Sequence, residues 1–345
     1  MVVLLSIRMV IESKRQNETM KTTIEPYDER YSIELKQYLF KIYPLYSEKY
    51  INYIITHAID HNKKESPALL VLNEKGKIVG CHFYYYSKAK IHGEIKSIKW
   101  GHDTFVEESY RGCGLATKID GLGSYGIGLS ETNVQIRKKK KATFFEGLNN
   151  YLIPNYRIVG DIIKSILGII ITKKTISPAK IKINDYHFSL VENANDIRIP
   201  NNGFWNETGL DIDFIRDVDF LKIRFFDIDV HKYFFYQCEE KNCYFVFRII
   251  SFKKVKTLFL VDYRYLFTEK DIFPTMMKAV KKLVKLNQCG AILCLSNDTE
   301  MAKYSKNHFG LKSPYTFTAT RNLGIPSSYK SLVTAGDSDA DFLRN

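Results

Sequence analysis

The stretch FVEESYRGCGLATKID, residues 105–120, changes character halfway along its length. It begins as an extended apolar and acidic run and ends with the composition of a helix, and Arg111-Gly112-Cys113-Gly114 stands between the two parts. Glycines at such a junction let the backbone adopt unusual dihedral angles and approach a ligand closely. The first N–H groups of a helix have no intrahelical partner and attract anions. The junction therefore predicts a strand, a loop that holds a phosphate group, and a helix.

Two common phosphate loops are excluded by the spacing of this junction. No Gly-Lys-Ser or Gly-Lys-Thr follows it, and its glycines lack the G-x-G-x-x-G spacing of dinucleotide-binding proteins. The junction resembles instead the pyrophosphate loop of the GNAT superfamily of acyltransferases, whose signature is Q/R-x-x-G-x-G/A after the fourth strand. Arg111, Gly114 and Ala116 occupy the three defining positions. Val106 and the YRG of residues 110–112 match the V-x-x-x-Y-R-G-x-G run that is common in the family.

Apolar patterning on both sides of the junction predicts a mixed α/β unit. Helical spacing covers residues 28–64, and two β-rich runs then flank a turn signature at residues 73–76. Further elements follow in the order strand, helix, strand, helix and two closing strands. They are expected at residues 97–106, 114–121, 124–130, 131–141, 142–148 and 149–154. The resemblance to the GNAT superfamily, with a readable motif, covers residues 22–157.

The second half of the chain repeats the order of elements but not the motif. Three strands joined by short turns precede a long amphipathic helix at residues 269–288, and a strand, a helix and a last strand follow. The junction at residues 261–273 has no R-x-x-G-x-G, while Asn297 and Tyr304 resemble the Asn and Tyr of the family's later helix. We therefore predict two tandem GNAT-like folds with mixed α/β sheets, the second without a cofactor. The expected ranges are 22–157 for the acyltransferase unit, 158–184 for a linker with an interdomain helix, 185–326 for the degenerate unit and 327–345 for a flexible tail.

The resemblance implies an acyl-CoA as cofactor, most often acetyl-CoA, and a direct transfer of the acyl group to an amine. Backbone N–H groups of the junction would hold the pyrophosphate, and the end of the preceding strand would bond the pantetheine arm as an added strand does. The residues assigned to the cofactor in this way are Phe105, Val106, Arg111, Gly112, Cys113, Gly114, Leu115, Ala116, Thr117 and Asn133. The acceptor is expected to be a small amine. The run FLKIRFFDIDVHKYFFY, residues 220–236, resembles a segment of bacterial GNAT proteins encoded near surface-polysaccharide genes, which points to an amino sugar.

An amine arrives protonated, so direct transfer needs a base or a water chain that accepts its proton. The polar residues near the end of the strand that are candidates are His102, Asp103, Glu107 and Glu108. Successive side chains of a strand alternate faces, so His102 and Thr104 should point away from Asp103 and Phe105. We favour Asp103 as the base, with His102 second, because the two glutamates stand close to the diphosphate loop.

The family often protonates the departing thiolate with a Tyr on the helix after the fifth strand. Residues 131–141 contain no Tyr, which leaves Tyr125 and Tyr151 as substitutes. Cys113 stands at the predicted helix N-terminus, but no His accompanies it at recognisable spacing, so covalent catalysis is not expected. The missing Tyr keeps a second interpretation open, that of a non-catalytic protein with a CoA site.

The net charge of +13, from 51 Lys and Arg against 38 Asp and Glu, favours an anionic partner such as a phosphorylated cofactor. The densest basic block, Arg137–Lys141, suits a CoA phosphate, an anionic substrate or nucleic acid. A basic nucleic-acid-binding module is therefore a third interpretation, but no aromatic platform interleaves with the block, and nucleic acid is not the expected partner. The six cysteines form no C-x-x-C pair, so we expect no metal site and a cytoplasmic protein with reduced thiols.

Neither apolar stretch of the chain predicts insertion into a membrane. Residues 158–171 are too short to span a bilayer and contain Asp161 and Lys164, so a packed or surface helix is expected, with association to a membrane surface as a minor alternative. Residues 1–15 lack the basic start and the cleavage site of a signal peptide, and Met20 is an alternative start. The sequence gives no indication of the oligomeric state.

Overall fold

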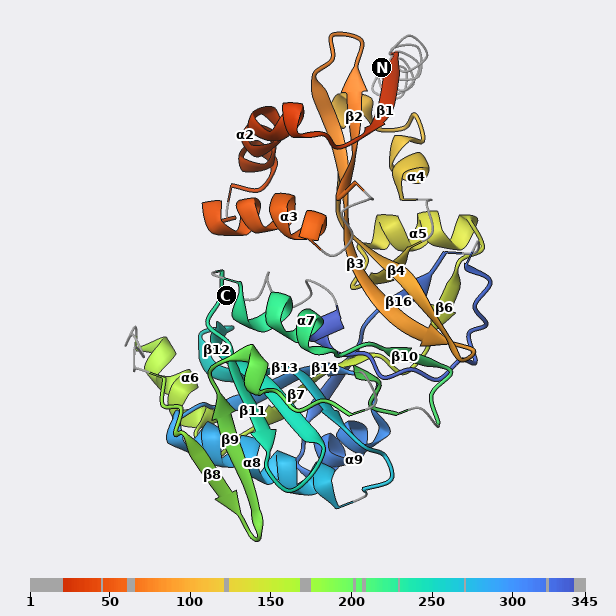
Figure 1. Ribbon diagram of the computed structural model, residues 1–345. Helices are drawn as coiled ribbons and strands as arrows, with labels where there is room; N and C mark the ends of the chain where they lie inside the picture. The colour runs from red at the N-terminus through yellow and green to blue at the C-terminus, as the bar shows by residue number, and fades with distance from the viewer. Residues whose placement is uncertain are drawn as a thin grey trace, which may run out of the picture.

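The computed structural model describes two eight-stranded sheets, which lie one above the other in the view of Figure 1. The described residues are 21–44, 46–60, 66–120, 124–167, 175–200, 203–206, 209–228, 230–269, 271–320 and 323–337. Both sheets contain parallel and antiparallel strand pairs and carry helices, which confirms the predicted mixed α/β class. The first 20 residues, with the alternative start Met20, lie outside the described part of the chain.

The first sheet has the strand order β1-β2-β3-β4-β5-β16-β6, and β10 pairs with β3. Its strands are β1 (Thr22–Pro26), β2 (Ala68–Asn73), β3 (Ile78–Ile91), β4 (Glu94–Val106), β5 (Tyr125–Ile127), β6 (Thr143–Phe145), β10 (Ile212–Phe214) and β16 (Phe317–Ala319). Only β4 and β5 are parallel to each other. The long β3–β4 hairpin turns at His92 and Gly93, which both adopt the positive φ that a tight hairpin turn needs.

Helices cover both faces of the first sheet. They are α2 (Ser32–Ile42), α3 (Glu48–Asp60), α4 (Leu115–Ile119) and α5 (Glu131–Lys139), and 3-10 turns lie at Glu29–Tyr31 and Glu108–Tyr110. Leu70 and Phe83 belong to the apolar cluster under α2 and α3, whereas Val71 and Val79 belong to the cluster under α4. Because neighbouring residues of a strand face opposite ways, Leu70 and Val71 identify the two faces. The predicted helices and hairpin are confirmed.

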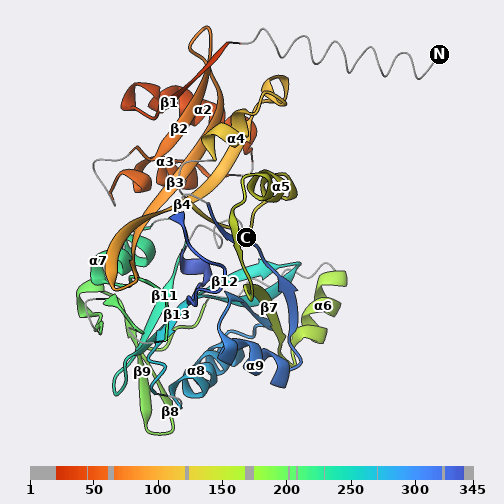
Figure 2. The same cartoon turned by 90° about the vertical axis from the view of Figure 1, so that its right-hand side faces the viewer.

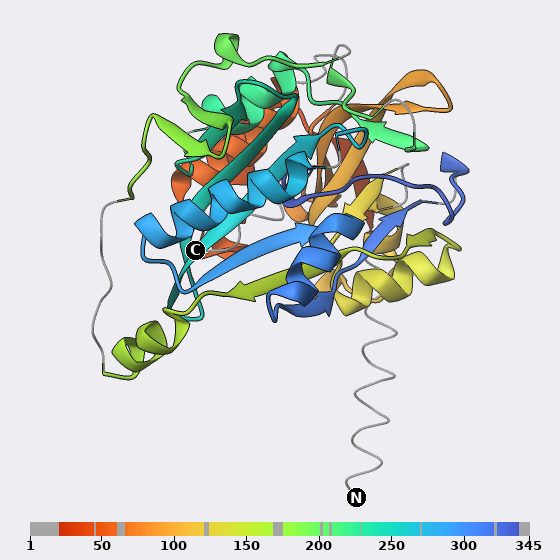
Figure 3. The same cartoon turned by 90° about the horizontal axis from the view of Figure 1, so that it is seen from below.

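The second sheet has the strand order β15-β7-β14-β13-β12-β11-β9-β8. Its strands are β7 (Asn149–Pro154), β8 (Lys180–Ile183), β9 (Tyr186–Val191), β11 (Phe234–Cys238), β12 (Cys243–Phe252), β13 (Val255–Tyr265), β14 (Ala291–Ser296) and β15 (Leu311–Pro314). Its helices are α6 (Ile158–Ile166), α7 (Val218–Leu221) with a π-helix at Lys222–Phe226, α8 (Ile272–Leu286) and α9 (Thr299–Asn307), with 3-10 turns at Ala194–Asp196 and Ala335–Asp337. Figure 3 shows α8 and α9 on the side of this sheet that is turned away from the first sheet.

Leaving β8 aside, the second sheet repeats the strand order of the first. β9, β11, β12 and β13 take the places of β1 to β4, while β14, β7 and β15 take those of β5, β16 and β6. The parallel pair β13–β14 stands where β4–β5 stands. A β-bulge interrupts β12–β13 just as another one interrupts β3–β4. The recurrence of element order that the sequence predicts is therefore found in the two sheets.

The two sheets exchange a strand. β7 follows β6 in the chain but pairs with β14 and β15 of the second sheet, and β16 from the end of the chain pairs with β5 and β6. The prediction that residues 142–154 close the first unit is therefore wrong for β7. An apolar pattern marks a segment as a strand without naming its partner, because any open strand edge offers the same backbone groups. The ranges 22–157 and 185–326 stay a prediction.

Residues 332–337 are buried, although the sequence predicts a flexible tail from residue 327. Thr334 pairs with Ser296 at the end of β14. Asp337 is 1 % exposed and bonds Arg216, whose other partner is Asp262 of β13 (Nη2–Oδ1 2.6 Å and Nε–Oδ2 2.9 Å). The segment thus lies across the opening between β13 and β14. Residues 338–345 of the expected tail are outside the described part of the chain.

Within the described ranges, no helix has both the length and the apolar composition needed to cross a membrane. α6, which lies in the expected linker, ends at Ile166 and leaves Val159, Ile163 and Ile166 exposed. It is therefore a surface helix, which is one of the arrangements that the sequence predicts for this stretch.

Candidate functional site

A fork in the first sheet forms the candidate site. The parallel strands β4 and β5 pair at Trp100 and Tyr125, and β5 ends two residues later while β4 continues to Val106. The edge of β4 beyond Trp100 is thus not covered by β5. Figure 2 shows β4 continuing toward α4 above the level at which α5 lies. The fork leaves room for a ligand beside a strand edge.

A cavity of about 410 Å³ runs from the fork to the glycine loop. Its lining comes from the end of β4, the loop, the start of α4 and the start of α5. Nine of the ten residues assigned to the cofactor from sequence line it, namely Phe105, Val106, Arg111, Gly112, Gly114, Leu115, Ala116, Thr117 and Asn133. Cys113 is the tenth and is not part of the lining.

The glycine loop has the backbone conformation that its sequence predicts. Gly112 and Gly114 have φ values of +90° and +72°, which other residues rarely adopt. The first described bond of α4 runs from the Lys118 N–H to the Gly114 carbonyl, so the N–H groups before Lys118 make no bond within the helix. Gly114, as the N-cap, has no side chain that could satisfy them. These N–H groups are available to an anion.

Arg111 fastens the loop to the end of its own strand. Its Nε donates to the Val106 carbonyl at 2.9 Å, and its guanidinium lies 5.5 Å from the centre of the Phe105 ring. The sequence assigns Arg111 to the cofactor as one of the defining positions of the loop motif. In the structure the guanidinium is folded back on the strand, so its contribution is to fix the loop as well as to add positive charge.

A β-bulge sets the position of Asp103. Cys81 pairs with Phe105 and Phe83 with His102, so β4 has one residue more than β3 between these pairs. Asp103 adopts a φ of +46° there. The predicted alternation of side chains is therefore wrong at this point. His102 and Asp103 contact each other, with Nδ1 and Oδ2 3.0 Å apart, instead of pointing to opposite faces.

The His102–Asp103 pair lies on the face of the first sheet that α2 and α3 cover. His102 stacks on Phe83 at 5.8 Å, and Tyr46, between α2 and α3, donates to Asp103 Oδ1 at 3.1 Å. The cavity of the glycine loop opens on the side of α4 and α5. Glu107, another candidate base, is bonded to Lys41 at 2.7 Å. The two preferred candidates thus stand at the fork, on the face opposite to the loop.

Of two residues that the sequence reasoning missed, one lies behind the cavity and the other lines it. His82 of β3 is 1 % exposed, and its Nδ1 is 2.7 Å from the hydroxyl oxygen of Thr104, which lines the cavity. Its Nε2 is buried and has no hydrogen-bond partner among the described residues. Burial holds the pKa of His82 well below its ordinary value, so the ring is neutral. In sequence, His82 sits in the run VGCHFYYY and reads as part of the core.

The two tyrosines considered as proton donors are not in the cavity. Tyr125 is fully buried against Trp100, with ring centres 5.2 Å apart, and burial raises its pKa. Tyr151 belongs to β7 of the second sheet, and burial raises its pKa as well. Neither can serve a ligand in the first sheet's fork.

The basic block Arg137–Lys141 is not a uniform solvated face. Arg137 is 1 % exposed and forms an ion pair with Asp120 at 2.9 Å, with further bonds to Ser124 and Thr318. Lys140 donates to the Thr117 carbonyl of α4. Two of the five basic residues therefore brace the site from inside, which removes them from a nucleic-acid surface.

At the corresponding place in the second sheet, the described residues present an acidic side chain and no glycine loop. Asp271 stands at the start of α8, where it accepts a bond from the Tyr186 hydroxyl at 2.8 Å. Residues 331–337 already lie across the fork between β13 and β14. Asn297 and Tyr304 do not act together: Asn297 bonds the backbone of this segment, and Tyr304 stacks on His308.

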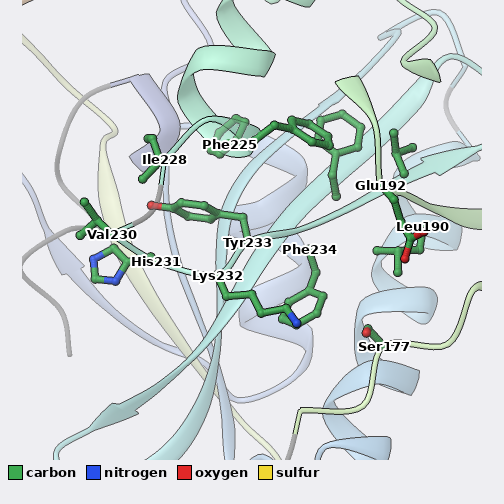
Figure 4. Close-up of a pocket in the computed structure, with 13 residues that line it drawn as sticks. Ser177, Leu190, Glu192, Phe225, Ile228, Val230, His231, Lys232, Tyr233 and Phe234 are labelled. Carbon is green, nitrogen blue, oxygen red and sulfur yellow. The ribbon is translucent and has the colours of Figure 1, made fainter. Parts of the chain in front are cut away.

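A second cavity of about 610 Å³ lies between the end of β9, the π-helix and the segment that leads into β11 (Figure 4). Its lining includes aromatic side chains such as Phe225 and Tyr233, together with the charged residues Lys232 and Glu192. Ile228 and Tyr233 of its lining pack against the apolar cluster under α2 and α3. The cavity is therefore next to the face of the first sheet that carries Asp103.

Comparisons with known proteins place the fold. No protein-family model and no curated protein matches the sequence. Among solved structures, a GCN5-related N-acetyltransferase from Anabaena variabilis matches 86% of this chain over 72% of its own, with 10% identity and a TM-score of 0.52. The chain has the GNAT fold. A GCN5-related N-acetyltransferase from Kribbella flavida matches similarly (10% identity, 87% and 71% of the two chains, TM-score 0.52).

The GNAT fold also includes an enzyme for long acyl chains. Saccharomyces cerevisiae N-myristoyltransferase with bound myristoyl-CoA matches 86% of this chain over 78% of its own, with 12% identity and a TM-score of 0.50. At such identities the likeness concerns the fold and leaves the acyl group and the acceptor to be argued from the site itself.

Proposed function

We propose that this protein is an acyl-CoA-dependent N-acyltransferase that transfers an acetyl group from acetyl-CoA to a small amine. The observation that carries the proposal is the fork between β4 and β5, together with the cavity that joins it to the glycine loop. The fork exposes the peptide groups of a strand edge, and the loop presents backbone N–H groups beyond it. A ligand with an amide-bearing arm and a diphosphate complements both features, and CoA is such a ligand.

The donor would lie along β4 with its pyrophosphate on the loop. Backbone N–H groups from Gly112 to Thr117 take the pyrophosphate, and the edge of β4 at Phe105 and Val106 takes the amides of the pantetheine arm. Asn133 lines the opposite wall from α5. Because the loop is at one end of this edge, the thioester reaches the other end, at Thr104 beside the fork.

Two glycines at the fork support a short acyl group. A Cβ on Gly101 would lie 2.9 Å from the His82 ring, and one on Gly126 would lie 3.2 Å from the Arg137 guanidinium. The buried side chains of His82 and Arg137 therefore fill the space behind the fork. The cavity itself reaches along β4 only as far as Thr104. A long acyl chain would have to displace them, whereas an acetyl group ends before them.

We expect activity to fall as the acyl chain grows. Overpacking a filled interior costs about 1–3 kcal/mol, so kcat/KM should drop about tenfold or more between acetyl-CoA and hexanoyl-CoA. Thiol release measured with a series from acetyl-CoA to myristoyl-CoA tests this. Binding of free CoA is the control, because the nucleotide and the arm are the same throughout. Equal kcat/KM values across the series would contradict the acetyl assignment.

The acceptor amine would approach from the face that α2 and α3 cover. Asp103 stands on this face and takes the proton of the ammonium group, so that the amine can attack the thioester carbon. The 610 Å³ cavity near the same face offers aromatic walls and a few charged groups, a combination that orients a small polar ring. We therefore propose an amino sugar, as in surface-glycan synthesis, as the acceptor class. The activity is that of a catalyst rather than of a silent CoA-binding protein.

A charge placed in the cavity tests CoA binding. Thr132 lines the cavity at the start of α5, where a glutamate is compatible with the helix, so Thr132→Glu should fold normally. Its charge should weaken acetyl-CoA binding about tenfold by repulsion of the diphosphate. Gln135→Glu makes the same change of charge on the same helix outside the cavity lining and should bind like the parent. Calorimetric titration measures both; equal affinities of the two variants would refute the site.

Thiol release with a panel of amino sugars and polyamines then separates a catalyst from a binder. Turnover above the rate of acetyl-CoA hydrolysis with any member of the panel supports the transferase. Tight acetyl-CoA binding with no turnover across the panel would favour the non-catalytic protein.

A further inference from the structure

His82 and Thr104 form a hydrogen-bonded pair that has no chemical role in the reaction proposed above. Thr104 is the residue of β4 that lines the cavity nearest to the fork. His82 lies behind it, fully enclosed, with its ring against Gly101 and close to Ser124. A neutral histidine buried in this way carries one proton, and the surroundings decide which nitrogen holds it.

The hydrogen bonds of His82 assign this proton to Nδ1. Nε2 has no partner among the described residues, and an N–H group buried without an acceptor is rarer than a buried acceptor without a donor. Nδ1 is 2.7 Å from Thr104 Oγ1. With the proton on Nδ1, His82 donates to the Thr104 oxygen, and the hydroxyl hydrogen of Thr104 must then point elsewhere. The direction that is open to it is the cavity.

We propose that Thr104 donates a hydrogen bond to the thioester sulfur and that His82 is the residue that positions its hydroxyl. This inference rests on the proposed function, because it needs CoA in the cavity. It supplies the sulfur partner that the missing Tyr of α5 would otherwise provide. Thr104 is the group that touches the cofactor, and His82 acts through it.

The step balances without any further reactant. The amine nitrogen forms a bond with the carbonyl carbon, and the C–S bond breaks with its electron pair moving to sulfur. The thiolate accepts the Thr104 hydrogen bond, and the second proton of the amine nitrogen, released as the amide forms, passes through water to the sulfur. Asp103 holds the proton that the amine has lost. Thr104 keeps its own proton throughout, since a hydroxyl is a far weaker acid than a thiol.

The pKa of the thiol of bound CoA tests the inference without an acceptor. Ultraviolet absorbance of the thiolate is followed as the pH of the wild-type complex with free CoA is raised. We expect the thiol pKa to lie below that of CoA in solution, because the Thr104 donor stabilises the thiolate. Thr104→Val should raise it by about one pH unit, and Thr104→Ser should leave it low. His82→Ala should raise it part of the way.

Thr132→Val is the matched control, because this second threonine lines the same cavity on the α5 side and should leave the thiol pKa unchanged. If wild type binds CoA with the thiol pKa of free CoA, the inference is overturned whatever the variants do. The same holds if Thr104→Val binds CoA with the wild-type thiol pKa. If wild type binds no CoA in calorimetry, the proposed function itself fails, and the two failures are thereby distinguished.

Discussion

Asp103→Asn is expected to lower kcat by about 100-fold or more while acetyl-CoA affinity stays unchanged. Asparagine has the size of aspartate and tolerates the φ of +46° that the bulge imposes, so the fold should be kept. It can still accept from Tyr46, but it cannot take a proton from an ammonium group. Steady-state kinetics with the acceptor found in the amine panel gives kcat, and calorimetry gives the affinity.

His102 distinguishes two versions of this proton transfer. If Asp103 is the base and His102 merely orients it through their 3.0 Å contact, His102→Gln should cost clearly less than Asp103→Asn. A larger loss for His102→Gln would make the imidazole the base and Asp103 its partner. If kcat falls by less than about fivefold in both variants, neither residue is the base, and a water chain accepts the proton of the amine.

Asp262→Asn is expected to lower the free energy of unfolding by about 3–5 kcal/mol, the largest stability effect that the structure indicates. Asp262 is fully buried and accepts from Arg216 at 2.9 Å and from Arg264 at 2.8 Å. Its loss leaves two buried guanidinium groups to share Asp337. Denaturant unfolding measures the change. Glu300→Gln, which breaks the exposed Lys303–Glu300 pair, should cost less than about 1 kcal/mol.

The same network makes the protein sensitive to acid. Burial alone would raise the pKa of Asp262, but Arg216 and Arg264 outweigh it and lower that pKa to about 2. A carboxyl whose pKa is lower in the folded state stabilises the fold above its unfolded pKa, near 4. This stabilisation is lost as the pH falls from about 4 toward 2. Unfolding curves of wild type should show the loss, and those of Asp262→Asn should lack this part of it.

The sequence predicts the features that depend on neighbouring residues in the chain. The glycine loop, the strand before it and the helix after it are read from residues 105–120, because backbone conformation at Gly112 and Gly114 is a local property. The resemblance that starts from the loop motif led to nine of the residues that line the cavity, eight of them from the motif region and Asn133 from the helix that follows. Local signals thus sufficed for the element order and for the residues on one side of the candidate site.

Features that depend on distant partners were predicted poorly. Asp103 shares a face with His102 because the register between β3 and β4 shifts at a β-bulge. No local sequence pattern marks the position of this bulge. His82 is a polar residue in an apolar strand, and it becomes a candidate site residue only because the fold places it behind the fork. Residues 332–337 were predicted to be mobile because they precede an acidic stretch, and the sequence does not show that Asp337 pairs with arginines more than 70 positions away.

The strand exchange has a consequence for how the protein is made. The first sheet receives β16, residues 317–319, only after all the other described strands of both sheets have been synthesised. Before β16 is synthesised, the edges of β5 and β6 that pair with it have no partner strand. Arg137 also lacks its hydrogen bond to Thr318 at that stage. Translation therefore delivers the glycine loop early and the last strand of its sheet late. A chain that stops short of β16 would carry the motif without the strand that joins β5 to β6.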